Sequence, residues 1–206
     1  MDQSEKITLK QAYDKHAEQR DRGGIEPWKA RERERFLHRL KGERRASLLE
    51  IGAGPGRDSL YFQEQGLDVT STDLSEEMVR LCREKGLNAR VMDFSRLDFP
   101  DESFDAVFAL NCLLHVPKAE LDGVLGEIRR VLKPDGLFFY GVYGGEETEG
   151  IWELDTYEPK RFFAMYEDDA IVRIAERQFA VEDFHTVDLG PQALHFQSML
   201  LRKKAD

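Results

Sequence analysis

The chain has 206 residues, 41% of them hydrophobic, and a formal net charge of −10. This length fits one domain that buries about 70% of its extended-chain surface, so its core needs no disulfide bonds. The acidic charge disfavours nucleic acid and anionic membranes as partners, and no apolar run reaches the roughly 18 residues that span a bilayer.

The first part of the chain predicts two helices, over residues 8–20 and 27–41, with a break at Arg22–Gly24. Pro27 suits the first position of the second helix. A basic run follows, but acidic residues are interleaved with its arginines, which is typical of a solvated helix face. A nucleic-acid-binding strip is the alternative, and it would carry fewer acidic residues. The N-terminus lacks the apolar stretch of a signal peptide, which predicts a cytoplasmic protein.

Strands and helices then alternate along the chain. Strands are predicted at residues 46–51, 68–72, 89–92, 104–110 and 137–142, with helices at 58–65, 75–84 and 118–132. This alternation predicts a parallel sheet with right-handed crossovers. After a helix near 168–178, residues 181–188 and 194–201 have no helix between them and predict an antiparallel hairpin at one sheet edge. Residues 144–166 form a long polar and aromatic loop, typical of a functional lid.

A glycine-rich turn stands between the first predicted strand and its helix, in the stretch "SLLEIGAGPGRDSLYF". Gly52, Gly54 and Gly56 permit positive φ and let a ligand approach the backbone closely. In an open parallel sheet, ligands bind beyond the carboxyl ends of the strands, where this turn lies. A tight turn without a ligand is the alternative, although one glycine would suffice for it.

Acidic residues end the next two predicted strands. Asp73 stands where a carboxylate can hold a ribose diol, and its alternative role is to cap the following helix, for which Ser75 is already suited. Asp93 and Phe94 offer an acceptor for an adenine amino group and an aromatic wall. The glycine turn and the two aspartates together predict a nucleoside site.

The turn departs from the dinucleotide-binding fingerprint. Arg57 stands where the last glycine is required, and Pro55 removes one amide donor from the loop. Glu50 at the entrance of the turn would repel a pyrophosphate and favour a ligand that carries ammonium and sulfonium groups.

These segments resemble the motifs of the class I S-adenosylmethionine-dependent methyltransferases, most of all the broad small-molecule group called type 11. "LLEIGAGPG" is similar to motif I, "VTSTDLS" to motif II, "VMDFSRLDFPDESFDAVFALNCLLHV" to motifs III and IV, and "EIRRVLKPDGLFFYGVY" to the helix and strand that follow. The resemblance covers residues 46–143. It implies a Rossmann-like α/β fold with sheet order 3-2-1-4-5-7-6, whose seventh strand is antiparallel. The expected single domain, 1–206, has a helical cap (1–45), a cofactor-binding core (46–143) and an acceptor loop with the sheet edge (144–206).

The resemblance also implies a site for S-adenosylmethionine. Its methionine and ribose moieties would lie against the glycine turn, with Glu50 near the ammonium group and Tyr13 closing over the methionine end. The cofactor-binding residues implied are Tyr13, Glu50, Gly52, Ala53, Gly54, Gly56, Asp73, Leu74, Asp93, Phe94 and Asn111.

Residues outside the core would select the methyl acceptor. Trp28, Trp152, Tyr157, Arg161 and Phe163 are predicted to form an aromatic pocket with a cationic corner, or alternatively to pack the cap onto the sheet. His115 lies near the expected sulfonium and is a candidate general base, although an orienting role is the competing interpretation. Cys112 lacks the preceding proline of cytosine-C5 enzymes and is interpreted as a buried small hydrophobe.

The sequence therefore predicts a methyltransferase that acts on a small molecule, as a monomer or homodimer, without nucleic acid, membrane or metal. A nicotinamide-dependent oxidoreductase on a similar fold and a non-catalytic S-adenosylmethionine-binding protein are the alternatives.

Overall fold

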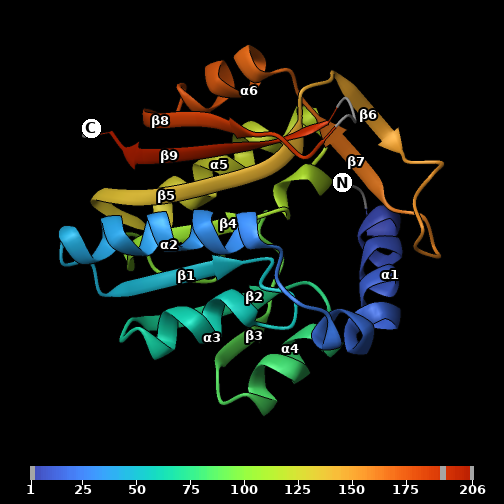
Figure 1. Ribbon diagram of the computed structural model, residues 1–206, viewed down its shortest axis with the longest axis horizontal. Coiled ribbons are helices and arrows are strands. Elements are labelled where there is room, and N and C mark those ends of the chain that lie inside the picture. Colours follow the sequence, from blue (N-terminus) through green and yellow to red (C-terminus); the bar gives the residue numbers. More distant parts are fainter. Residues whose placement is uncertain (1–2, 191–193, 205–206) are drawn as a thin grey trace.

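The computed structural model describes residues 3–190 and 194–204. Its strands and helices alternate through the middle of the chain, as the apolar pattern predicts (Figure 1). The strands are β1 (Ser47–Ile51), β2 (Asp68–Asp73), β3 (Asn88–Val91), β4 (Phe104–Leu110), β5 (Leu132–Gly144), β6 (Thr148–Ile151), β7 (Phe162–Met165), β8 (Phe179–Val187) and β9 (His195–Lys203). The helices are α1 (Gln3–Arg22), α2 (Pro27–Gly42), α3 (Arg57–Glu64), α4 (Glu76–Glu84), the 3-10 turn η1 (Leu113–His115), α5 (Lys118–Val131) and α6 (Asp168–Ala175).

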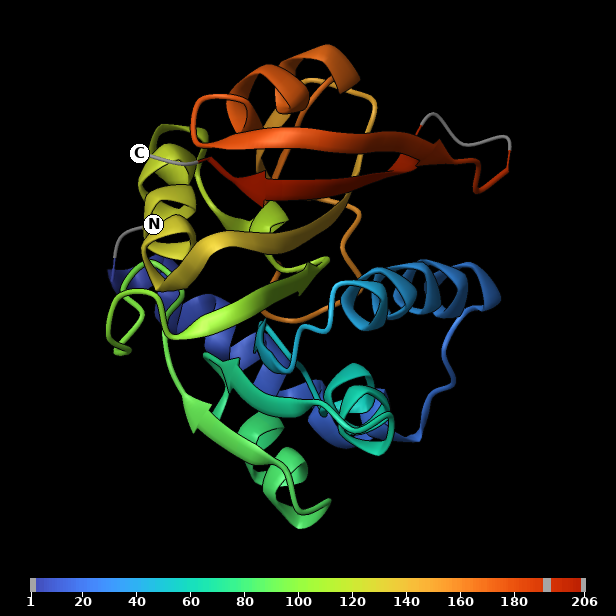
Figure 2. The ribbon, with the colours of Figure 1, turned by 90° about the vertical axis from the view of Figure 1, so that its left-hand side faces the viewer.

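Seven strands form the main sheet in the order β3-β2-β1-β4-β5-β9-β8. The first five pair in parallel, whereas β9 pairs antiparallel with both β5 and β8. Figure 2 shows this succession from β8 and β9 at the top to β3 at the bottom. The predicted order 3-2-1-4-5-7-6 and the antiparallel C-terminal hairpin are confirmed.

Helices cover both faces of the sheet, because alternate strand residues point to opposite sides. On β4, Phe108 packs with Phe36 of α2 and Phe62 of α3, while its neighbour Val107 packs with Ile128 of α5. Every one of these side chains is at most 2% exposed. The rigid core brings the carboxyl ends of β1, β2 and β4 together at one edge.

Two segments differ from the prediction. The "KPDG" sequence does not separate α5 from β5 but interrupts β5, whose pairing with β4 shifts after Leu132 and resumes at Leu137. The expected loop 144–166 contains a hairpin, β6–β7, in which Thr148 pairs with Met165. The short β6 sequence "TEGI" has no apolar alternation, and this explains why the pattern did not indicate a strand.

Helix α1 lies beyond the carboxyl ends of the parallel strands, beside the β6–β7 hairpin (Figure 1). Only three of its residues, Leu9, Ala12 and Ala17, are buried. One face of α1 instead forms ion pairs with α4 and the residues around it: Lys6–Asp93 (2.6 Å), Lys10–Glu76 (3.7 Å), Glu18–Arg80 (2.6 Å) and Asp21–Lys85 (2.6 Å). Charge pairing therefore contributes much of the contact that holds this cap.

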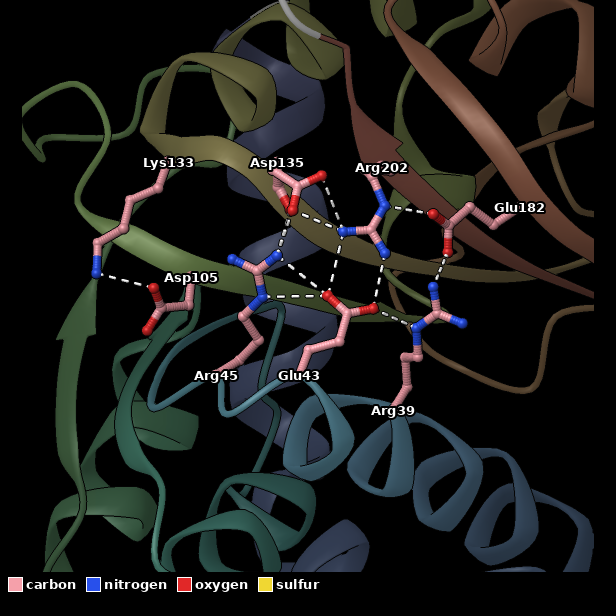
Figure 3. A network of polar contacts seen from close by, with 8 residues as sticks. All are labelled: Arg39, Glu43, Arg45, Asp105, Lys133, Asp135, Glu182 and Arg202. Atoms are coloured by element: carbon pink, nitrogen blue, oxygen red, sulfur yellow. Dashed lines mark hydrogen bonds and ion pairs between the residues drawn. The ribbon is translucent and has the colours of Figure 1, made fainter.

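A network of ion pairs lies at the opposite edge of the sheet, near the amino ends of β1, β4 and β5 (Figure 3). Glu43 accepts from Arg39, Arg45 and Arg202, and its hydrogen bond with Arg202 is the main reason that its pKa falls to about 2. Asp135 pairs with Arg45 at 2.7 Å. Part of the basic run of α2 is thus neutralised within the protein, which favours the solvated-face interpretation over a nucleic-acid strip.

Candidate active site

A cavity lies between α1 and the carboxyl ends of β1, β2 and β4; we call it the first cavity. Its wall contains these residues of the predicted cofactor set: Tyr13, Gly52, Gly54, Asp73, Leu74, Asp93, Phe94 and Asn111. His115 lies on the same wall. The topology places them there because each follows the carboxyl end of a strand or belongs to α1.

Each of the three glycines of the turn is favoured at its position for a different physical reason. A Cβ on Gly52 would lie 2.3 Å from Cβ of Cys112, and one on Gly56 would meet the Leu87 and Cys82 side chains. Gly54, at φ +55°, has no atom within 4 Å of that position, so its surface is open to the cavity. Gly54 is the glycine whose exposed backbone suits contact with a ligand.

Asp73 connects the glycine turn to α4. One carboxylate oxygen accepts from the Gly54 N–H at 2.8 Å and the other from the Ser75 N–H at 2.9 Å. Ser75 itself caps α4 by accepting from the Met78 N–H. Burial raises the pKa of Asp73, although its two amide partners oppose that shift. Each oxygen keeps a further lone pair, so the same carboxylate can brace the turn and accept from a ribose hydroxyl.

Glu50, Ala53 and Gly56 do not line the first cavity. The Glu50 side chain is buried and accepts a hydrogen bond from Ser59 of α3, whose hydroxyl also accepts from Ser71 at 2.6 Å. Burial raises the pKa of Glu50 well above its ordinary value. In this structure the Glu50 carboxylate therefore faces α3, and its expected contact with a ligand's ammonium group stays a prediction.

At the other end of the first cavity, Asp93 already has partners. Its carboxylate forms an ion pair with Lys6 at 2.6 Å and accepts from the Ser95 N–H at 2.8 Å. Lys6 was not predicted, because one lysine in a charged helix carries no signal of its own. Phe94 lies on the wall of the first cavity, where it was expected as an aromatic neighbour to the adenine ring.

A chain of hydrogen bonds links α1 to η1 and β7. Nδ1 of His115 lies 2.7 Å from the Phe162 carbonyl oxygen, and Nε2 lies 2.7 Å from the Tyr13 hydroxyl. A carbonyl can only accept, so Nδ1 carries the proton and Nε2 accepts from Tyr13. Burial lowers the pKa of His115 to about 3. His115 is thus a neutral imidazole whose lone pair is occupied, which is a poor arrangement for a general base.

A second, larger cavity lies on the other side of Tyr13 and His115. All five predicted acceptor residues, Trp28, Trp152, Tyr157, Arg161 and Phe163, are on its wall. Trp28 and Phe163 also pack against the hydrophobic core, which supports the packing role for them, and their role toward an acceptor stays a prediction. The two cavities share Tyr13, Arg20, Asn111 and His115, and we call these four residues the junction.

The cationic corner differs from the expectation. Arg161 forms a bidentate ion pair with Asp155, at 2.8 and 2.7 Å, and donates its remaining nitrogen to the Tyr13 hydroxyl at 3.0 Å. The Asp155 side chain is only 1% exposed, so the Arg161 charge is matched locally. Arg20, which sequence reasoning missed, donates to Tyr157 at 3.2 Å and has no carboxylate partner within the described residues.

Asn111, also at the junction, combines an uncommon backbone conformation with an unpartnered side-chain oxygen. It adopts φ +57°, a conformation that asparagine tolerates better than most residues. Its amide oxygen is buried and accepts no hydrogen bond from the described residues. An unpartnered buried acceptor on the wall of both cavities indicates that a ligand donor can complete it.

Two features are absent from residues 3–190 and 194–204. These residues contain no cluster of three or more side chains that could hold a metal ion. They also contain no helix that is long and apolar enough to cross a membrane.

Comparison with known proteins agrees with this arrangement. A family model described as "Methyltransferase domain" matches residues 49–140. A sterol 24-C-methyltransferase of Gibberella zeae is 35% identical over 143 residues, which cover 64% of this chain and 36% of the relative. The chain thus spans about a third of that relative's length.

Solved structures match over more of the chain. The 1,6-didemethyltoxoflavin-N1-methyltransferase of Burkholderia thailandensis, bound to its named substrate and S-adenosylhomocysteine, has a TM-score of 0.75 and 25% identity; the match covers 97% of this chain and 88% of that one. The magnesium protoporphyrin IX methyltransferase of Synechocystis PCC 6803, with bound S-adenosylmethionine, shares the fold at 14% identity, with a TM-score of 0.72 and coverage of 99% and 98%. In its sheet order, glycine turn and matched domain model, the chain is similar to the class I S-adenosylmethionine-dependent methyltransferases.

Proposed function

We propose that this protein transfers the methyl group of S-adenosylmethionine to a small-molecule acceptor. The observation that carries the proposal is the junction, where the first cavity meets the larger second cavity at Tyr13, Arg20, Asn111 and His115. A transferase needs its two substrates to meet at one point that is shielded from water. A protein that only stores the cofactor has no need of the second cavity.

The residues of the first cavity suit S-adenosylmethionine. Gly54 offers open backbone, Asp73 has free lone pairs for the ribose, and Asp93 with Phe94 would hold the adenine. Bound there, S-adenosylmethionine supplies an electrophilic methyl group on a sulfonium. The protein then has to orient the acceptor, and the occupied lone pair of His115 makes this residue a positioning group for Tyr13 rather than a base.

A small acceptor fits the second cavity better than a macromolecule. Aromatic side chains contribute to its wall, and it is bounded by α1 and by the β6–β7 hairpin. The relatives and solved neighbours named above carry small-molecule acceptors in their names, a sterol in one case and a toxoflavin precursor in another. A cytoplasmic location and a monomeric or homodimeric state stay predictions.

Isothermal titration of the protein with S-adenosylhomocysteine and, separately, with NAD tests cofactor choice. We expect heat of binding with the former only. A methyl-release assay over a metabolite panel then tests transfer. Binding of S-adenosylhomocysteine without turnover on any acceptor would support the non-catalytic binding protein instead.

A further inference from the structure

We infer that the acceptor is a planar aromatic compound with an acidic O–H or N–H, which reacts as its anion. This inference rests on the proposed function and names the substrate class of the second cavity. It is carried by the charges and hydrogen bonds at the junction and by the side chains that form the remaining wall.

The charged groups on the second cavity's wall are unequally paired. Lys29 pairs with Glu26 at 2.6 Å, and Arg161 is matched by Asp155. Arg20 has no such partner within the described residues, and it lies on the wall of both cavities. The remaining acid, Asp188, lines only the second cavity and is not part of the junction. The four junction residues therefore carry one positive charge, on Arg20, which interacts with Asp73 on the side of the first cavity. On the side of the second cavity this charge favours an anion.

No group at the junction is free to remove a proton from the acceptor. The Nε2 lone pair of His115 accepts from Tyr13, and the Tyr13 oxygen accepts from Arg161. An amine acceptor would become a cation after methylation, and it would have to lose a proton beside Arg20. An anionic acceptor has no proton to lose, so the junction as built is sufficient for it.

Charge balance points to the same class. The lone pair of an O⁻ or N⁻ nucleophile forms the new bond to the methyl carbon, the carbon–sulfur bond breaks, and sulfur keeps that electron pair. The anion and the sulfonium neutralise one another, and no co-reactant is needed. A neutral alkene carbon, by contrast, would leave a carbocation near two guanidinium groups. On this ground the junction is poorly suited to the carbon methylation named for the sterol relatives.

The remaining side chains on the wall of the second cavity suit an acceptor with a flat aromatic ring. Trp28, Tyr143, Trp152, Tyr157 and Phe163 all contribute to this wall. The Arg161 guanidinium lies 3.7 Å from the Tyr157 ring centroid, so one wall already has a stacked, planar arrangement. Aromatic side chains bind planar ligands by stacking and by edge contacts.

A matched set of coumarins tests the inference on protein saturated with S-adenosylhomocysteine. The probes are 7-aminocoumarin, 7-methoxycoumarin and 7-hydroxycoumarin, and only the last of these carries an ionisable phenol. Affinity is measured by fluorescence at about pH 9, where the phenol of 7-hydroxycoumarin is ionised, and at about pH 6, where it is not. We expect 7-hydroxycoumarin to bind roughly five- to tenfold more tightly than the other two probes, and only at the higher pH. This ratio is the effect expected of one partly exposed hydrogen bond between the phenolate and a charged donor.

Variants of α1 assign the effect to its residue. Arg20→Gln should abolish the preference and Arg20→Lys should retain it, whereas Arg22→Gln, which removes an equal charge from the same helix end but lines neither cavity, should leave it unchanged. Equal affinity for the three probes, tighter binding of the amine, or no binding of the hydroxy probe would overturn the inference. Absence of S-adenosylhomocysteine binding would instead overturn the proposed function.

Discussion

Acidification should destabilise this protein through His115 at a higher pH than the one at which Glu43 is protonated. The imidazole is 3% exposed, accepts from Tyr13 and donates to the Phe162 carbonyl. Burial lowers its pKa from 6.5 to about 3. Between these values the unfolded chain binds a proton that the folded protein does not, so stability falls as the pH falls.

The size of this loss follows from the two pKa values. Each unit of separation is worth about 1.4 kcal/mol, so the loss reaches about 2 kcal/mol at pH 5 and has a ceiling of about 5 kcal/mol below pH 3. Glu43, whose pKa is about 2, loses its contribution only below about pH 4.5. Glu43 therefore contributes nothing to the change between about pH 7.5 and pH 5, whereas Glu50 and Asp73, whose pKa values burial raises, cancel in a comparison with a His115 variant.

Urea unfolding at these two pH values measures the effect. We compare the parent with His115→Asn, which cannot titrate in this range, so that every other group contributes equally to both proteins. The parent should lose about 2 kcal/mol more stability than the variant on acidification. Parallel pH dependence of the two proteins would show that His115 is accessible to protons, and would restore it as a candidate base.

Three further outcomes are expected. Asp73→Asn should weaken S-adenosylhomocysteine binding by about 1–3 kcal/mol in isothermal titration, and equal affinity of this variant and an Asp68→Asn control would leave Asp73 as a brace only. Gly52→Ala should cost about 2–5 kcal/mol of stability, because its Cβ would overlap Cys112 in addition to the strain of positive φ. Gly54→Ala has only that strain and should cost about 1–2 kcal/mol. Similar losses for the two variants in denaturant unfolding would contradict this geometry. Raising salt to about 1 M should speed amide hydrogen exchange in α1 more than in α5, since α1 depends on exposed ion pairs; uniform exchange would refute this.

Most of the fold could be predicted because its signals are local. The Phe104–Leu110 run is buried on both faces, and the absence of a helix after Val181 indicates an antiparallel edge. The β6–β7 hairpin could not be predicted, because its pairing depends on partners some fourteen positions apart with no alternation in "TEGI". Long-range pairing of this kind leaves little trace in a short window.

The candidate site divides in the same way. Gly54 and Asp73 belong to motifs with fixed spacing, and both lie on the wall of the first cavity. Arg20 and Lys6 acquire their positions only from the docking of α1 across the sheet, which depends on tertiary ion pairs. The burial of Glu50 against Ser59 is likewise invisible in sequence, since a carboxylate at a strand end looks the same whether it faces a helix or a cavity.

Where the transferred methyl group lies is the point on which the whole account depends. Nuclear Overhauser contacts from the ¹³C-labelled methyl of S-adenosylmethionine, bound to the intact protein, locate it directly. We expect contacts from this methyl to the ring protons of Tyr13 and His115 at the junction. Contacts to Phe94 and Lys6 instead, with none at the junction, would contradict this expectation.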